Sequence, residues 1–201
     1  MYDSLNLTAG TGDNPDRVAE NRRRACVELG LDADRLSFNR QVHSPTVHRA
    51  GGRGEPGDGL WSDDPGLPML AFSADCLPIA IARTDGVRRL AVVHAGWRGL
   101  SEGVVEAAVA EVGGSASAVI GPAIGPCCYE VGEEVASLFD DDLTTDRHLD
   151  LWSTAERILR QAGVESVERT DLCTRCNEAL FFSHRRSGRA RGVQGVLGAV
   201  A

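Results

Sequence analysis

The chain has 201 residues, of which 42% are hydrophobic and 25% are charged, a composition that supports a packed core and excludes a mainly disordered chain. Its formal net charge of −8 argues against nucleic acid as a partner, because phosphate binding requires clustered cationic side chains. No run of about 18 apolar residues could span a membrane, and the first residues lack the basic and apolar regions of a signal peptide. We therefore expect a cytoplasmic protein that binds neither nucleic acid nor a membrane and whose six cysteines are thiols or metal ligands.

The first half of the sequence predicts one helix and four strands. Asn14 and Pro15 form a helix start, and apolar residues then recur at helical spacing up to Gly30. Apolar runs separated by Gly, Pro and Asp clusters predict strands at 36–42, 69–73, 77–82 and 88–94. The glycine-rich residues 50–68 are expected to form a long loop, which in a compact domain is either functional or mobile.

The second half mixes helices and strands. Helical patterns occupy 101–112, 133–139 and 150–162, with a helical turn at 177–183, and strand patterns occupy 118–121, 164–170 and 192–200. The two kinds of element do not alternate strictly, so we expect an α+β or mixed α/β fold. No repeat or linker interrupts the sequence, which predicts one domain over residues 1–201.

Three metal-capable side chains end predicted strands at similar local positions: His43, Cys76 and His94. Strand ends that gather at one edge of a sheet would bring these side chains within coordination range. Two imidazoles, one thiolate and an open fourth position are the donor set of a catalytic zinc, which lowers the pKa of a bound water. The sequence therefore predicts zinc at these residues, whereas magnesium would require oxygen ligands.

An alternative interpretation makes these residues structural. Cys76 could fill a small apolar gap, and His43 could cap the turn at Ser44-Pro45. The spacings along the chain match no short zinc motif, so spacing alone leaves both interpretations open. Asp75 could orient a ligand imidazole as a hydrogen-bond acceptor, or it could cap the turn beside Cys76.

Four further cysteines form a second group of candidate ligands: Cys127, Cys128, Cys173 and Cys176. The last two have the Cys-x-x-Cys spacing of a zinc knuckle or a redox motif. Adjacent cysteines seldom bind one ion together, and a second Cys-x-x-Cys is absent, so packed or hydrogen-bonded thiols are favoured over a four-thiolate zinc. A thioredoxin-like role would need that fold's order of elements, which this sequence lacks.

The segment from Gly121 to Gly132 combines three glycines with two prolines and precedes a predicted helix. Exposed backbone N–H groups in such a loop can hold an anion or line a substrate pocket. Cys128 and Tyr129, which lie within it, are therefore candidate substrate residues. A plain connection between two elements is the alternative.

The turn after His94 offers a candidate phosphate site. The planar guanidinium of Arg98 matches the geometry of phosphate, and the backbone of Gly96 and Gly99 could add donors. Alternatively, Arg98 simply covers Trp97.

Seven motifs occur in order along the chain and together resemble one known family. They are Ser4-Leu5-Asn6-Leu7, Asn21-Arg22, Gln41-Val42-His43, Ala74-Asp75-Cys76-Leu77-Pro78, His94-Ala95-Gly96-Trp97-Arg98-Gly99, Gly121-Pro122 through Gly132, and Phe181-Phe182-Ser183-His184-Arg185-Arg186. The set resembles the YfiH family, also called the laccase-domain or polyphenol oxidase family, over nearly the whole chain. The resemblance implies an α+β sandwich of mixed sheets covered by helices, and a zinc held by His43, Cys76 and His94.

The resemblance implies several activities. Members of the family are described as purine nucleoside phosphorylases that also deaminate adenosine and phosphorolyse methylthioadenosine, as copper-dependent polyphenol oxidases, and as peptidoglycan editing factors that remove serine from a muropeptide precursor. A full laccase copper set needs many closely spaced histidines, whereas this chain has five and no His-x-His, so copper oxidation is expected only as a side reaction. We expect a zinc-dependent enzyme whose small-molecule substrates are a purine nucleoside and phosphate. A muropeptide amidase and a non-enzymatic binding module with a structural metal are the alternatives.

Three positions depart from the family pattern. The match to the family begins at residues 2–6, whereas relatives carry an upstream strand and a glycine-containing turn before that point, so we expect one wall of the pocket to be missing or built differently. Ser44 stands where a glycine often follows the first ligand, and Cys176 lies outside the pattern. These departures bear on substrate preference more than on metal binding.

Overall fold

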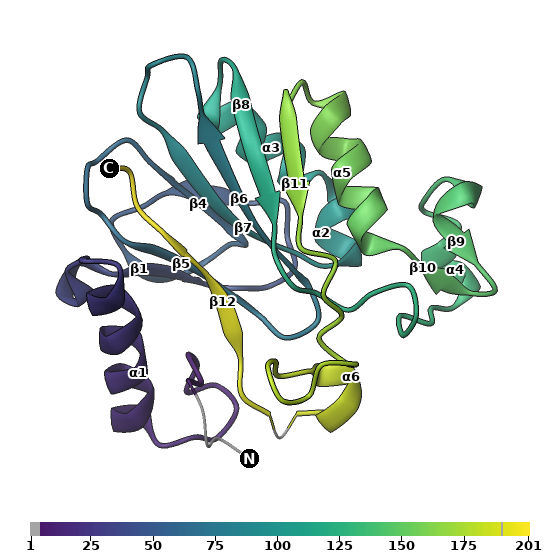
Figure 1. The fold of residues 1–201 in the computed structure, drawn as a ribbon, viewed down its shortest axis with the longest axis horizontal. Coiled ribbons are helices and arrows are strands. Elements are labelled where there is room, and N and C mark those ends of the chain that lie inside the picture. Colours follow the sequence, from purple (N-terminus) through teal and green to yellow (C-terminus); the bar gives the residue numbers. More distant parts are fainter. Residues whose placement is uncertain (1–4, 190) are drawn as a thin grey trace.

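The computed structural model describes residues 5–189 and 191–201, so Ser4 of the first family motif lies outside the described residues. Within these ranges the chain forms a six-stranded sheet, a four-stranded sheet and a two-stranded ribbon, with six α-helices (Figure 1). Both large sheets combine parallel and antiparallel pairs. The prediction of an α+β fold with mixed sheets is confirmed.

The elements have the following bounds. The six-stranded sheet consists of β2 (Val47–Arg49), β4 (Gly59–Ser62), β6 (Leu77–Arg83), β7 (Leu90–Ala95), β8 (Ala116–Ile120) and β11 (Ser166–Arg169). The four-stranded sheet consists of β1 (Ser37–Arg40), β3 (Arg53–Pro56), β5 (Met69–Ser73) and β12 (Gln194–Gly198), and the ribbon of β9 (Thr144–Thr145) and β10 (His148–Leu149). The helices are α1 (Pro15–Glu28), α2 (Trp97–Glu102), α3 (Val104–Val112), α4 (Glu133–Ala136), α5 (Leu151–Gln161) and α6 (His184–Ser187), with 3₁₀ turns η1 (Ala33–Arg35) and η2 (Asp141–Leu143).

The two large sheets pack face to face, and their alternating side chains define the layers. In β5, Met69 and Ala71 pack with Val92 of β7 between the sheets, whereas Leu70 contributes to a cluster on the outer face with Cys26 of α1. Successive residues of a strand point to opposite faces, so one strand serves both clusters. Helix α1 therefore covers the outer face of the four-stranded sheet.

The largest core lies on the other side of the six-stranded sheet. Val93 and Ile79 of this sheet pack against Val105 and Ala108 of α3 and Leu159 of α5, all buried. Figure 1 shows α3 and α5 beside this sheet, far from α1. The order of layers is thus helix, sheet, sheet, helices. Among the described residues, no helix has the length and apolarity needed to cross a bilayer.

The chain passes from the four-stranded to the six-stranded sheet three times in succession. The order of the six-stranded sheet is β11-β8-β6-β7-β4-β2, that of the other sheet is β12-β5-β1-β3, and β1 to β6 belong to the two sheets in turn. The crossings β1 to β2, β3 to β4 and β5 to β6 carry His43, Asp58 and Cys76 respectively. Three side chains distant in sequence are therefore delivered to one end of the sandwich.

Several predicted boundaries are wrong for identifiable reasons. The loop expected at 50–68 contains β3 and β4, whose short glycine-containing sequences hide their pairing with β1 and β7. The helix expected at 101–112 is two helices, because Gly103 adopts a left-handed conformation with φ 92°. The helical turn expected at 177–183 is present, with the N–H groups of Leu180 and Phe181 donating to the Asn177 carbonyl at 3.1 and 3.0 Å. The short helix α6 follows it, and there the Ser183 side chain accepts a hydrogen bond from the Arg186 N–H.

Candidate metal centre and cavity

His94 is placed by β7. It points to the same face as Val92, toward the four-stranded sheet, and only 4% of its surface is exposed. Its Nδ1 atom bonds Oδ1 of Asp58 at 2.8 Å. Because Nδ1 is occupied, Nε2 is the nitrogen left to bind a metal or substrate.

Asp58 holds both histidine-bearing segments. Besides the His94 ring, its buried carboxylate accepts the backbone N–H groups of Val42 at 3.1 Å, His43 at 3.0 Å and Ser44 at 2.7 Å, and the Ser44 hydroxyl at 3.0 Å. Burial raises its pKa, but the bonds from His94 and Ser44 outweigh burial and lower the pKa to about 2. The carboxylate is therefore ionised at neutral pH.

His43 adopts a backbone conformation that is unusual for a residue with a side chain. Its φ of 60° lies in the left-handed region, and the bond from its N–H to Asp58 holds the backbone there. The preceding Gln41 pairs with the backbone of Phe72 in both directions, at 2.8 Å and 2.6 Å. The crossing after β1 is thus fixed to β5 before the ligand position is reached.

Cys76 lies in the turn from β5 to β6. The Ser73 hydroxyl donates to its carbonyl, and its Sγ atom lies 3.8 Å from Nε2 of His43. Burial raises the pKa of the thiol, but the neighbouring imidazoles of His94 and His43 outweigh this effect and lower it. The environment therefore favours the thiolate, which is the metal-binding form.

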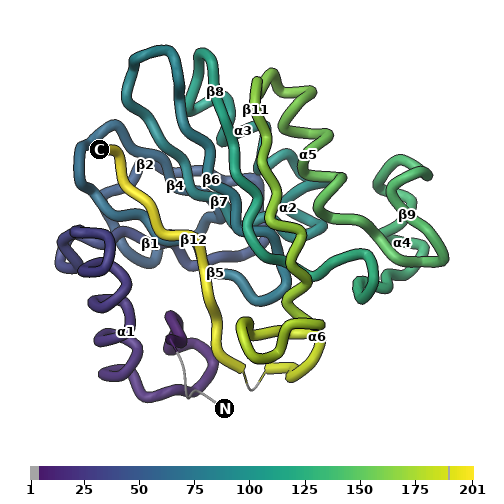
Figure 2. Tube along the Cα trace, viewed as in Figure 1, coloured from purple at the N-terminus to yellow at the C-terminus, as the bar shows by residue number. Residues whose placement is uncertain are grey.

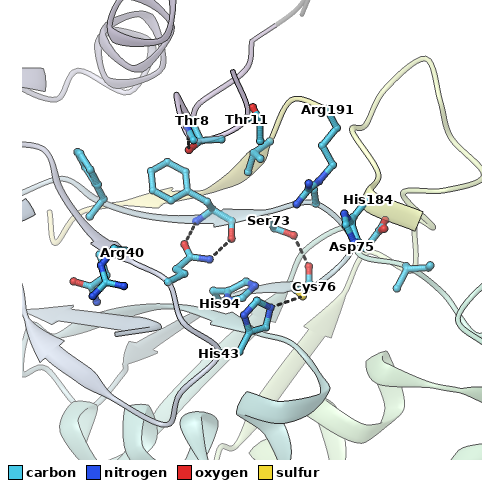
Figure 3. Close-up of a pocket in the computed structure, with 18 of the residues that line it drawn as sticks. Thr8, Thr11, Arg40, His43, Ser73, Asp75, Cys76, His94, His184 and Arg191 are labelled. Carbon is cyan, nitrogen blue, oxygen red and sulfur yellow. Dashed lines mark hydrogen bonds between the residues drawn. The ribbon is translucent and has the colours of Figure 1, made fainter. Parts of the chain in front are cut away.

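The three donor atoms form a compact cluster. Those of His43, Cys76 and His94 all lie within 4.8 Å of one another, and the two imidazole centroids are 4.8 Å apart (Figure 3). A tetrahedral zinc with nitrogen and sulfur ligands requires separations of about 3.3 to 3.8 Å, so small side-chain adjustments suffice. A Cβ on Gly96 would lie 2.9 Å from the Cys76 sulfur, which explains why a residue without a side chain borders the cluster.

The described hydrogen bonds of the Asp75 carboxylate go to groups other than the ligand imidazoles. Its carboxylate accepts hydrogen bonds from the Thr174 hydroxyl at 2.6 Å, the Ser183 hydroxyl at 3.1 Å and the Arg185 backbone N–H at 2.6 Å. Asp75 was expected to orient a ligand imidazole, but the carboxylate that bonds the His94 ring is that of Asp58. Asp75 instead ties the segment around α6 to the turn that carries Cys76.

The cluster opens into a cavity of about 780 Å³ at the same end of the sandwich. Its polar and cationic walls come from both halves of the sequence: Thr8, Thr11, Arg22, Arg40, Gln41, Ser73, His184, Arg185 and Arg191. Aromatic surface is supplied by Phe38, Phe72, Trp97 and Tyr129. Burial raises the pKa of the Tyr129 phenol, which stays protonated at neutral pH.

The residues after His94 contribute less to the lining of the cavity than the sequence predicts. Arg98 is exposed outside the lining of the cavity, and its guanidinium lies 5.1 Å from the Trp97 ring centroid. Gly99 allows close packing of Val104 behind α2. The structure therefore favours the covering role of Arg98 over phosphate binding. Of the loop candidates, Tyr129 lines the cavity, whereas Cys128 lies with the other cysteines.

Sequence reasoning missed two kinds of site residue. Asp58 was hidden in the supposed loop, where the only signal was an acidic residue between two glycines. Arg191 ends the arginine-rich stretch 185–191, which was the only signal for it, and it borders the cavity beside Ser73 and His184 (Figure 3). Its Nε atom is buried without a hydrogen-bond partner among the described residues.

The fold and the site together define a class of protein: a two-sheet α+β sandwich with a two-histidine, one-cysteine cluster at the floor of a cavity. The sequence of residues 1–200 matches the family model described as multi-copper polyphenol oxidoreductase laccase. The chain belongs to this laccase-domain, or YfiH, family.

Individual relatives agree with this assignment. The chain is similar to a protein named purine nucleoside phosphorylase YfiH from Shigella flexneri, with 39% identity over 92% of this chain and 82% of the relative. A Pseudomonas aeruginosa relative, also named a purine nucleoside phosphorylase, is 39% identical over 94% of this chain and 83% of its own length. Among solved structures, YlmD from Geobacillus stearothermophilus superimposes with a TM-score of 0.85 and 31% identity, covering 98% of this chain and 84% of that one.

Proposed function

We propose that this chain is a zinc-dependent purine nucleoside phosphorylase acting on adenosine, inosine and methylthioadenosine, with adenosine deamination as a second activity of the same site. The proposal rests chiefly on the open His43, Cys76 and His94 cluster at the floor of a cavity of about 780 Å³. This volume is in the range typical of sites for small organic ligands. The names of the relatives supply the substrate class.

Phosphorolysis sets three requirements for the chain. A phosphate oxygen bonds to the anomeric carbon, the bond from that carbon to the purine nitrogen breaks, and its electron pair leaves with the purine, which takes up a proton. The protein must therefore hold an anion, present a flat apolar surface to the base, and offer the base a proton or hydrogen bond. When bound, the zinc supplies a Lewis acid that polarises a substrate oxygen or an attacking water.

We assign phosphate binding to Arg191. Its guanidinium borders the cavity, and its buried Nε lacks a hydrogen-bond partner among the described residues. Burial lowers the pKa of Arg191, yet an arginine stays charged at neutral pH. A planar cation with unused donors suits a phosphate better than the exposed Arg98 does.

We assign binding of the purine to the aromatic wall. Phe38 and Phe72 stand edge to face, with ring centroids 5.6 Å apart, and both line the cavity. Tyr129 borders the same cavity and carries a neutral hydroxyl that can donate to a purine nitrogen. The ribose then lies between the aromatic wall and the zinc-binding cluster.

The histidines make a multi-copper oxidase a weaker candidate. All five lie within the described residues, and only His43 and His94 share a potential metal cluster. A full laccase set would need more imidazoles together, so copper in place of zinc would support at most a side reaction. No particular feature of the cavity favours the muropeptide amidase or the purely structural metal.

The test is product analysis with the zinc-loaded protein. We expect ribose 1-phosphate and free base from adenosine or inosine only when phosphate is present, and inosine from adenosine in its absence. Serine release from a muropeptide precursor and catechol oxidation by the copper-loaded protein are assayed in parallel. No turnover of any nucleoside, or turnover only of the precursor, would overturn the proposal.

A further inference from the structure

A second cluster of sulfur atoms lies on the loops that follow β8 and β11. Cys127 and Cys128 belong to the first loop, and Cys173 and Cys176 to the second. The two strands are parallel neighbours, with Ile120 opposite Arg169, so their following loops emerge at the same edge of the sheet. A bridge between Ala123 and Cys173 continues this pairing into the loops.

The separations of the four sulfur atoms suit a shared ion. They all lie within 4.8 Å of one another, with Cys127 to Cys176 at 3.7 Å and Cys128 to Cys176 at 3.4 Å. Sulfur atoms around a tetrahedral zinc, with Zn–S bonds of about 2.3 Å, are about 3.8 Å apart. A disulfide requires about 2.05 Å, and all four cysteines are free.

The adjacent pair, which the sequence argued against, is accommodated by a tight turn. The N–H groups of Cys128 and Tyr129 both donate to the Gly125 carbonyl, at 2.9 and 3.0 Å. This helix-like turn separates successive side chains by only about 100°, so both thiols can reach one point. Gly125 has no side chain, and a Cβ there would meet the Trp152 ring at 2.5 Å.

Donors around the cluster suit sulfur atoms that carry charge. The Gly125 N–H donates to Sγ of Cys173 at 3.4 Å. The Arg186 guanidinium bonds the carbonyls of Thr174 and Arg175 within the turn between the two cysteines, at 2.9 and 3.0 Å. Backbone N–H bonds to sulfur and a nearby cation offset the negative charge of metal-bound thiolates.

We propose that Cys127, Cys128, Cys173 and Cys176 bind a structural zinc that is distinct from the His43, Cys76 and His94 cluster. Four soft thiolates close the coordination shell and leave no position for substrate. Binding replaces the thiol protons with the ion and involves no oxidation.

This zinc would brace one wall of the cavity. Thr174 stands between the two cysteines of the second loop, and its hydroxyl donates to Asp75 beside Cys76. Ile124 and Tyr129, which flank the first pair of cysteines, line the cavity. The ion therefore ties both loops to the turn that carries a ligand of the other cluster.

Metal counting on the full chain tests the proposal. We expect two zinc ions per wild-type molecule, one in His94→Ala, and one in Cys176→Ser. Cys176 is exposed, so its substitution leaves the core intact, and retention of one ion shows that the variant is folded. Cys26→Ala serves as a control, because Cys26 lies on α1 and packs with Leu70 of the four-stranded sheet, outside both clusters, and it should keep both ions.

X-ray absorption of zinc in the His94→Ala variant supplies a second measurement. Four sulfur neighbours at about 2.3 Å are expected, without nitrogen. A single zinc in the wild type that is lost in His94→Ala, a second ion with nitrogen or oxygen ligands, or iron in place of zinc would overturn the proposal. Two ions without nucleoside turnover would support it and contradict only the proposed function.

Discussion

The two clusters occupy one edge of the same sheet but differ in their donors and surroundings. One has two imidazoles and a thiol at the floor of a cavity, and the other has four thiols, one of them buried, on the loops that follow β8 and β11. The Ile124 N–H donates to the Asp75 carbonyl at 2.8 Å, which directly joins the loop of one cluster to the turn of the other. The donor atoms are similarly close in both clusters, but three donors leave a coordination position open, whereas four donors close the site.

The number of protein donors and their accessibility, rather than the presence of cysteine, distinguish a catalytic metal site from a structural one. A site with three protein donors keeps a position for water or substrate, whereas four thiolates fill it. The carboxylate that orients His94 serves the open site, while backbone N–H groups serve the closed one. Variants at each cluster should therefore have separable effects.

Removing a ligand of the open cluster should have the largest effect. His94→Ala should lower kcat/KM for nucleoside phosphorolysis by about 1,000-fold, since metal polarisation contributes several kcal/mol and each 1.36 kcal/mol is tenfold. Steady-state kinetics with metal analysis measure this effect. An unchanged kcat/KM in protein that has lost one zinc would separate the activity from this cluster.

Removing a ligand of the closed cluster should act on stability. Cys176→Ser should lower Tm by roughly 5–10 °C, because a ligand at 100 times its Kd contributes about 2.7 kcal/mol to a domain of this size. Calorimetry with and without a zinc chelator measures the shift. If the chelator destabilises Cys176→Ser as much as the wild type, the contrast between the clusters fails.

Weakening the support of the open cluster should have an intermediate effect. Asp58→Asn should reduce zinc affinity at that cluster by about 10- to 100-fold, because the amide cannot accept all the donors that now meet the carboxylate. Competition with a chromophoric chelator measures the affinity. The matched control, Asp64→Asn, changes an exposed acid paired with Arg35 and should leave both affinities unchanged.

The smallest effect is expected at the phosphate subsite. Arg191→Ala should raise the KM for phosphate about tenfold, since a hydrogen bond to a charged group contributes about 1.5–3 kcal/mol. Arg98→Ala should change this KM by less than about twofold, as surface substitutions have small effects. The reverse order of effects would return phosphate binding to the turn after His94.

The sequence predicts the open cluster well, because each of its three residues stands at the end of an apolar run that is itself a local strand signal. His43, Cys76 and His94 each follow an apolar run, and the runs correspond to β1, β5 and β7. Strands 69–73 and 77–82 and the helix at 150–162 are found within one residue of their predicted bounds, since apolar periodicity and caps are local signals. The α+β class follows from the same elements.

Non-local pairing explains what the sequence leaves open. The four cysteines meet only because β11 pairs in parallel with β8, and no local feature of either loop specifies that pairing. β3 and β4 are not predicted, because each has only four residues and is stabilised by pairing with a strand distant in the sequence, β1 and β7 respectively, in two different sheets. The prediction of phosphate binding at Arg98 is not supported, because Arg98 lies on the exposed side of α2, and the local sequence does not indicate which side of the helix faces solvent.

The cavity also joins segments that are synthesised far apart in time. Val193 donates its N–H to the Asn6 side chain at 2.9 Å, and the Leu7 N–H donates to the Val193 carbonyl at 2.9 Å, so early and late residues lie side by side (Figure 2). Both Thr8 and Arg191 border the cavity. Completing this wall of the cavity therefore requires a contact between residues 187 positions apart in the sequence, and contacts of such long range form slowly during folding.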